Sequence, residues 1–178
     1  TMNLIAGARR ATSGSVELEG HELTAARPDE TARLGISRTF QLVRILPALS
    51  VLENAVAGAV FGHKRRWGRE ADVFATDLLE RVGLADKVSV PVSALTYIDQ
   101  KRLELARALA GEPEVLLLDE WLSGLNPSEL QVGIDMILTL QAAGRTVILV
   151  EHDRDAICAP RARRVVMKSA ERKAGGQP

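Results

Sequence analysis

The sequence contains few aromatic side chains and a single cysteine. Aromatic residues make up 3% of the 178 residues, whereas 46% are hydrophobic, so Ala, Leu and Val supply most of the apolar content. The one cysteine, Cys158, excludes an internal disulfide and fits a reducing compartment. This composition is typical of alternating helices and buried parallel strands. The sequence therefore predicts one α/β domain over residues 1–178, long enough to bury a sizeable core.

Net charge and long apolar runs are also missing. The 23 basic and 23 acidic side chains cancel, which argues against nucleic acid as a partner. No run approaches the roughly 18 apolar residues that span a bilayer, and no basic region followed by an apolar core opens the chain. We therefore expect a cytoplasmic protein whose contact with a membrane is peripheral.

The first half of the chain combines short strands with helices. Residues 15–20 alternate polar and apolar side chains and end in glycine, which predicts a half-buried strand entering a turn. A helix over 29–34 and a short strand over 36–40 follow. Helix-like spacing then recurs over residues 51–60, 70–82 and 100–110. Because no strand interrupts this region, we predict an inserted helical subdomain over about residues 48–110.

Two wholly apolar runs, 115–118 and 147–150, have the character of strands buried on both faces, and the helix between them, 128–142, predicts a parallel βαβ unit. Asp119 and Glu120 directly follow the first run, at the sheet edge where ligands collect. One carboxylate there can hold Mg²⁺ while its neighbour polarises a water molecule, although acidic residues can also simply end a strand. His152 follows the second run and can hydrogen-bond a phosphate oxygen or that water.

The order of these segments resembles the ATP-binding subunits of ABC transporters, most closely those of branched-chain amino acid importers. The likeness runs from about residue 3 to 166 and includes Gly35-Ile36-Ser37-Arg38-Thr39-Phe40-Gln41 and Gly124-Leu125-Asn126-Pro127. It implies a P-loop NTPase core that binds ATP and Mg²⁺.

The resemblance also assigns roles to individual residues. It implies Asp119 as a metal ligand, Glu120 as the catalytic base and His152 as a switch residue, and Gln41 would reach the metal or the attacking water. Nucleotide contacts are implied for Thr96, in the signature motif, and for Asn126, in the loop facing a second subunit.

Three departures from the family pattern affect the expected activity. The glycine-rich Walker A loop and the strands before it do not occur in these 178 residues, so we expect the chain to begin just after that loop. Ile98 and Asp99 stand in the signature motif where small residues are usual, which predicts weaker binding to the partner's nucleotide. Trp121 replaces the proline that usually follows the carboxylates.

We therefore expect an ATP-hydrolysing importer subunit at the inner face of the cell membrane, working with a second ATPase subunit and with transmembrane permease subunits. The alternative is a hydrolysis-incompetent fragment without the phosphate-binding loop. A soluble ABC ATPase acting on ribosomes or DNA is disfavoured, because only 54 residues separate Gln41 from Leu95 (95 − 41) and they show no sustained heptad repeat.

Overall fold

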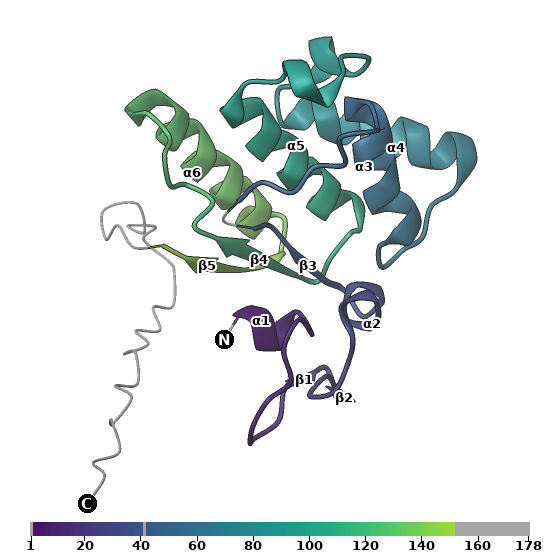
Figure 1. Cartoon of the computed structure of the whole chain (residues 1–178), viewed down its shortest axis with the longest axis vertical. Coiled ribbons are helices and arrows are strands. Elements are labelled where there is room, and N and C mark those ends of the chain that lie inside the picture. Colours follow the sequence, from purple (N-terminus) through teal and green to yellow (C-terminus); the bar gives the residue numbers. More distant parts are fainter. Residues whose placement is uncertain (1, 41, 152–178) are drawn as a thin grey trace, which may run out of the picture.

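A three-stranded parallel sheet lies at the centre of the computed structural model, which describes residues 2–40 and 42–151 (Figure 1). Its strands are β3 (Ile36–Arg38), β4 (Val115–Asp119) and β5 (Thr146–Val150), in the order β3-β4-β5. The middle strand is β4, whose residues are apolar and buried up to the last one, Asp119, as expected of a strand covered on both faces. The fold is thus α/β with a parallel sheet, as the sequence predicts.

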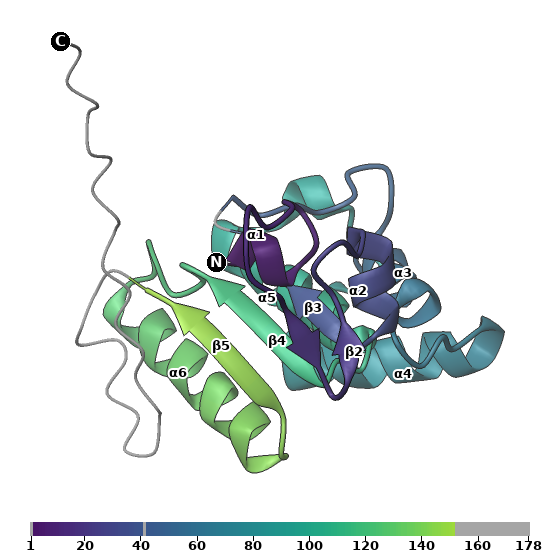
Figure 2. The same ribbon diagram turned by 90° about the horizontal axis from the view of Figure 1, so that it is seen from below.

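Helices cover one face of this sheet, and the N-terminal segment covers the other (Figures 1 and 2). The covering helices are α5 (Tyr97–Ala110) and α6 (Pro127–Ala142). On the opposite face lie α1 (Met2–Ile5), the hairpin of β1 (Glu17–Leu18) and β2 (His21–Glu22), and α2 (Pro28–Arg33). Met2 and Leu23 pack there against Ile36, Val115 and Leu117, so both faces of β4 are buried.

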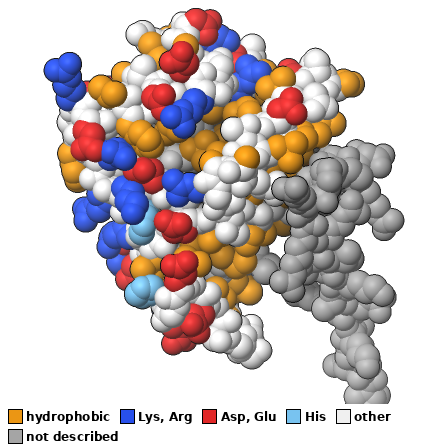
Figure 3. All heavy atoms as spheres, turned by 180° about the vertical axis from the view of Figure 1, so that it is seen from behind, with side chains coloured by type: hydrophobic (Ala, Val, Ile, Leu, Met, Phe, Trp, Pro, Cys, Tyr) orange, Lys and Arg blue, Asp and Glu red, His pale blue; other side chains and the backbone are white. Residues whose placement is uncertain are grey.

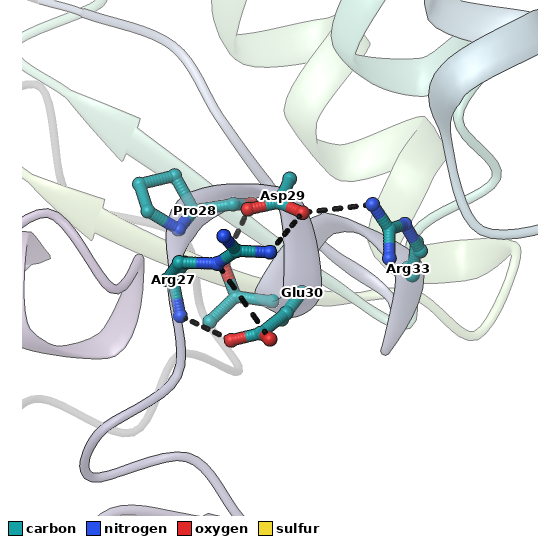
Figure 4. A network of polar contacts seen from close by, with 6 residues as sticks. Arg27, Pro28, Asp29, Glu30 and Arg33 are labelled. Atoms are coloured by element: carbon teal, nitrogen blue, oxygen red, sulfur yellow. Dashed lines mark hydrogen bonds and ion pairs between the residues drawn. The ribbon is translucent and has the colours of Figure 1, made fainter.

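The α2 helix is short and is stabilised at its N-terminus by its own side chains (Figure 4). The Arg27 amide donates to the Glu30 carboxylate at 2.7 Å, and Asp29 pairs with both Arg27 and Arg33. Because these groups are exposed, the ion pairs add little stability. Their main effect is to fix where α2 begins, at Pro28.

The middle of the chain forms a helical unit, made of α3 (Val51–Phe61), α4 (Gly68–Arg81), two 3-10 helices, η1 (Ala85–Lys87) and η2 (Val92–Ala94), and α5. A reciprocal capping box between Ser50 and Glu53 starts α3. The unit has a core of its own, while α5 also faces the sheet: Leu103 and Ala106 belong to the helical core, and Leu105 and Ala108 pack with β4 and α6. Within residues 2–40 and 42–151, no helix is both long and apolar enough to cross a membrane.

Candidate functional site

The predicted carboxylate pair lies at the carboxyl end of β4, next to β5. Asp119 is in register with Val150, and the Glu120 amide donates to the Val150 carbonyl at 2.8 Å. The pairing of the two strands is as the sequence predicts. Glu120 has a φ of +49°, in the left-handed region that costs energy for residues with a Cβ. The backbone therefore turns sharply directly after Asp119.

Asp119 is held by an arginine from the neighbouring strand. The Arg38 guanidinium donates to Asp119 Oδ2 at 2.5 Å, and its other terminal nitrogen contacts Asn3 Oδ1 in α1. The Arg38 side chain is only 10% exposed and that of Asp119 22%, so the pair is partly shielded from water. This contact ties α1, β3 and β4 together at the edge of the sheet where ligands collect.

A buried lysine supports the loop that follows Glu120. Lys101 in α5 is 2% exposed, and its ammonium group donates to the carbonyl oxygens of Trp121, at 2.8 Å, and Ser123. The indole N–H of Trp121 donates back to the Lys101 carbonyl at 3.3 Å. Burial lowers the pKa of Lys101, and the nearby carboxylates, Glu151 first, act against that shift. Trp121 thus packs in the core at the position where the family usually has proline.

The strand β5 supplies a further contact to this loop. Glu151 Oε1 accepts a hydrogen bond from the Leu122 amide at 2.8 Å. The turn after Glu120 is therefore held from α5 by Lys101 and from the end of β5 by Glu151. Two predicted site residues, Gln41 and His152, lie outside the residues that the structure describes.

The signature-motif residue Thr96 caps a helix. Its hydroxyl accepts from the Asp99 amide at the N-terminus of α5 and donates to Asp99 Oδ2 at 2.7 Å. Asp99 is buried and also pairs with Lys87 and Arg102. Burial acts to raise the pKa of Asp99, but the hydrogen bonds from Lys87 and Thr96 outweigh it and the pKa is lowered. The Asp99 carboxylate is therefore paired with cations inside the protein, and the weaker binding to a partner's nucleotide remains a prediction.

The other residue predicted to contact a nucleotide, Asn126, caps the next helix. Its side-chain oxygen accepts from the amides of Ser128 and Glu129 at the start of α6, at 3.1 and 3.0 Å. Thr96 and Asn126 therefore act as helix caps in this structure, and their predicted nucleotide contacts remain predictions.

The site offers one carboxylate, Asp119, that can hold a magnesium ion. No group of three or more His, Cys, Asp or Glu residues that could hold a metal occurs in the part of the chain that the structure describes. Magnesium in nucleotide sites is commonly bound by one or two carboxylates together with the phosphates. Asp119 fits that role, with Arg38 as the cation that pairs with it in this structure.

Comparison with known proteins defines the class. The family model for ABC transporters matches residues 1–123, so the chain belongs to this family and is an ABC ATPase by lineage.

Among curated relatives, the high-affinity branched-chain amino acid transport ATP-binding protein LivG of Escherichia coli is 33% identical over 99% of this chain and 74% of its own length. BraF of Pseudomonas aeruginosa, described in the same words, is 32% identical over the same shares. A ribose import ATP-binding protein of Rubrobacter xylanophilus, RbsA 3, is 34% identical over 88% of this chain and 32% of its own length.

A solved ATP-binding cassette of an ABC transporter, MJ1267 in its ADP conformation, superposes with a TM-score of 0.77 at 28% identity. The match covers 88% of this chain and 66% of that one, so the chain spans slightly less than two thirds of the solved cassette.

Sequence reasoning missed the supporting residues of the site, namely Arg38, Lys101 and Glu151. One signal was available: Arg38 is a cation in a strand beside the strand that ends in Asp119. Lys101 and Glu151 offered none, because their partners are backbone groups of a loop whose path the sequence does not specify.

Proposed function

We propose that this chain is the ATP-binding and ATP-hydrolysing part of an ABC importer subunit that works with Mg²⁺ at the cytoplasmic face of the membrane. The observation that carries the proposal is the placement of Asp119 and Glu120 at the carboxyl end of β4, with Glu120 on a left-handed backbone turn held by its neighbours. Asp119 would hold the metal, and Glu120 would accept a proton from the attacking water.

The chain's own residues would prepare that step. Mg²⁺ with ATP supplies the electrophilic phosphorus and neutralises its developing charge. Lys101 and Glu151 hydrogen-bond the backbone of residues 121–123, and they would thereby fix the turn that directly follows Glu120. Gln41 and His152 are assigned to contacts with the metal, the water or the terminal phosphate, and Thr96 and Asn126 to the nucleotide of a second subunit.

An apolar groove between α3 and the segment after β3 supports a membrane partner. Its cavity of about 430 Å³ is lined by residues that include Ile45, Leu46, Ala57, Phe61 and Arg107. Phe61 is 71% exposed, which is unusual for a phenylalanine with no partner to cover it. We assign this groove to a helix of the permease.

On the face shown in Figure 3, acidic and basic side chains are interspersed, so no basic stripe for nucleic acid lies there.

The relatives named above favour branched-chain amino acids as the transported compounds, and ribose is the competing assignment. A second ATPase subunit completes the site, and the altered signature motif at Ile98 favours a paralogue over a second copy. The alternative is a subunit unable to hydrolyse ATP, as expected if these 178 residues act without a glycine-rich phosphate loop.

A titration with a fluorescent ATP analogue and Mg²⁺ tests the proposal, using this chain beside a version with a grafted glycine-rich loop. We expect binding only with the graft, and turnover that Glu120→Gln stops without stopping binding. Glu114→Gln is the matched control, because this exposed carboxylate lies at the opposite end of β4. If neither version binds, the proposed ATP binding fails; if both substitutions behave alike, the assignment of Glu120 fails.

A further inference from the structure

The basic loop, residues 62–69, joins α3 to α4 and combines exposed cations with an exposed tryptophan. Lys64, Arg65 and Arg69 are exposed, and none of the three forms an ion pair with any residue that the structure describes. Trp67 is 60% exposed, although the chain has only two tryptophans, one tyrosine and three phenylalanines. A large apolar ring in water beside unpaired cations marks this loop as a candidate interaction surface.

The base of the basic loop is fixed to the rest of the protein. The His63 amide donates to the Gly111 carbonyl, and the Arg66 amide donates to the Ala59 carbonyl, both at 2.9 Å. The two residues between these anchors form the tip, and the second of them, Arg65, has a φ of +52°, in the left-handed region of a tight turn. The tip therefore holds two cations in a defined place, so little ordering is needed before it binds a partner.

One cation of the basic loop turns inward and occupies the carboxylates beside it. Arg66 Nε donates to Glu112 Oε2 at 2.9 Å, and another nitrogen of the same guanidinium pairs with Glu70. The guanidinium carbon of Arg66 also lies 4.4 Å from the centre of the Phe74 ring. The three outer cations are thus left without these carboxylates as partners.

The charge at this end of the molecule is positive, whereas the charge of the whole chain is zero. Residues 62–73 have two more basic than acidic side chains (4 − 2): Lys64, Arg65, Arg66 and Arg69 against Glu70 and Asp72. A local excess of this kind attracts an anionic surface.

The apolar side chains around the cations favour a lipid surface over nucleic acid. Phe61 is 71% exposed, Trp67 60% and Val73 62%. Tryptophan is enriched where a membrane meets water, and neighbouring Lys and Arg side chains attract anionic headgroups. A nucleic acid would be bound by a longer track of cations that follows its phosphates, which the three outer cations do not provide.

The basic loop also lies beside the groove assigned to a permease helix. Phe61 and Gly62 line that groove, and α3 and α4 lie on the side of the molecule away from β5 (Figures 1 and 2). We propose that the basic loop binds an anionic lipid surface directly, with its three outer cations at the headgroups and the Trp67 ring at their boundary with the acyl chains. Only the orientation of the loop towards the membrane rests on the proposed function.

Sedimentation with vesicles measures this binding on the whole 178-residue chain, without permease or nucleotide. We expect binding to phosphatidylcholine vesicles of which about one third is phosphatidylserine, and release as salt screens the charges. Each cation at such a surface changes the affinity about fivefold, so Lys64→Gln combined with Arg65→Asn should weaken binding about 25-fold. Asparagine is chosen at position 65 because it tolerates the left-handed region.

Two exposed arginines that follow α1 supply the matched control. Arg9→Gln combined with Arg10→Gln removes the same charge far from the basic loop in the sequence, and it should change the affinity by less than about twofold. Arg69→Gln is the second test variant in case the double variant of the tip does not fold, and it should weaken binding about fivefold.

Tryptophan fluorescence shows whether the basic loop itself meets the lipid. The other tryptophan, Trp121, is 1% exposed, so a change on adding vesicles reports on Trp67. Anionic vesicles should shift the emission to shorter wavelength, and Trp67→Phe should abolish the shift.

Four outcomes would overturn the proposal. They are no binding of the wild type to anionic vesicles, an equal loss of affinity in the tip variant and its control, an unchanged emission on binding, and tighter binding to a single-stranded oligonucleotide than to the vesicles. Because neither ATP nor a permease is present, failure here is separate from failure of the ATPase assignment.

Discussion

Replacing Gly58 by alanine should destabilise the protein although alanine is the better helix former. Gly58 lies in α3 where this helix crosses α5. A Cβ at this position would lie 2.1 Å from the Arg107 carbonyl oxygen and 3.0 Å from Ala110 Cβ. An ordinary contact needs more than 3 Å, so the two helix backbones would have to separate by about 1 Å.

Two opposing terms set the size of the effect. The change from glycine to alanine in a helix stabilises by about 1 kcal/mol. Overpacking of a core costs about 1–3 kcal/mol, and the upper end applies here because the obstacle is a backbone carbonyl that no rotamer change can move. We expect a net loss of about 2 kcal/mol in the free energy of unfolding.

Urea denaturation followed by circular dichroism measures this loss, and Gly133→Ala provides a matched comparison. Gly133 is also helical, in α6, but its Cβ would meet the ends of the Leu122 and Trp121 side chains, at 2.7 and 3.0 Å. Side chains can adjust, so this variant should stay within about 1 kcal/mol of the wild type. Equal losses for the two variants, or no loss for Gly58→Ala, would refute the reasoning.

Three further predictions concern α5. Lys101→Met leaves the Trp121 and Ser123 carbonyls without their buried donor, and each unsatisfied carbonyl costs about 1–3 kcal/mol. Urea unfolding should therefore show that the free energy of unfolding falls by at least about 2 kcal/mol. A loss below about 0.5 kcal/mol would contradict this role of Lys101. Burial raises the pKa of Glu104 above its ordinary value of 4.5, so its contribution to stability is complete below that pH and declines as the pH rises through the folded-state pKa. The stability advantage of wild type over Glu104→Gln should therefore shrink from acid to neutral pH, and parallel pH profiles would exclude the effect. Thr96→Ala removes the cap of α5 and should cost about 1 kcal/mol in the same assay, whereas Thr76→Ala, a hydroxyl within α4, should cost less.

The sequence predicts the elements well because their signals are local. The apolar runs at 115–118 and 147–150 become β4 and β5 with one residue added to each, and the helix expected over 128–142 begins at Pro127. The residue patterns of buried strands and capped helices extend over only a few consecutive residues, so they can be recognised in the sequence alone. The pairing of β4 with β5 follows from the right-handed crossover between parallel strands.

The surroundings of the site could be predicted only in part, because they depend on contacts between distant segments. Asp119 and Glu120 stand out at a strand end, but the partner of Asp119 is 81 residues away at Arg38. The inward turn of Asp99 was unpredictable for the same reason: Lys87, which neutralises it, comes from η1 at the end of a separate connection. The sequence of a motif does not reveal whether a charged side chain points into the protein or into solvent, because that depends on the packing around it.

The double use of α5 sets a limit on how this protein can be recombined with its relatives. Leu103 and Ala106 on one side of the helix belong to the helical core, and Leu105 and Ala108 on the other belong to the core beneath the sheet. A chimera that exchanged the helical unit at Ala110 would take the whole helical core with it, but it would also bring Leu105 and Ala108 of foreign origin into the core at the sheet. A junction before Tyr97 would instead separate Leu103 and Ala106 from the rest of the helical core, so neither junction leaves both cores intact.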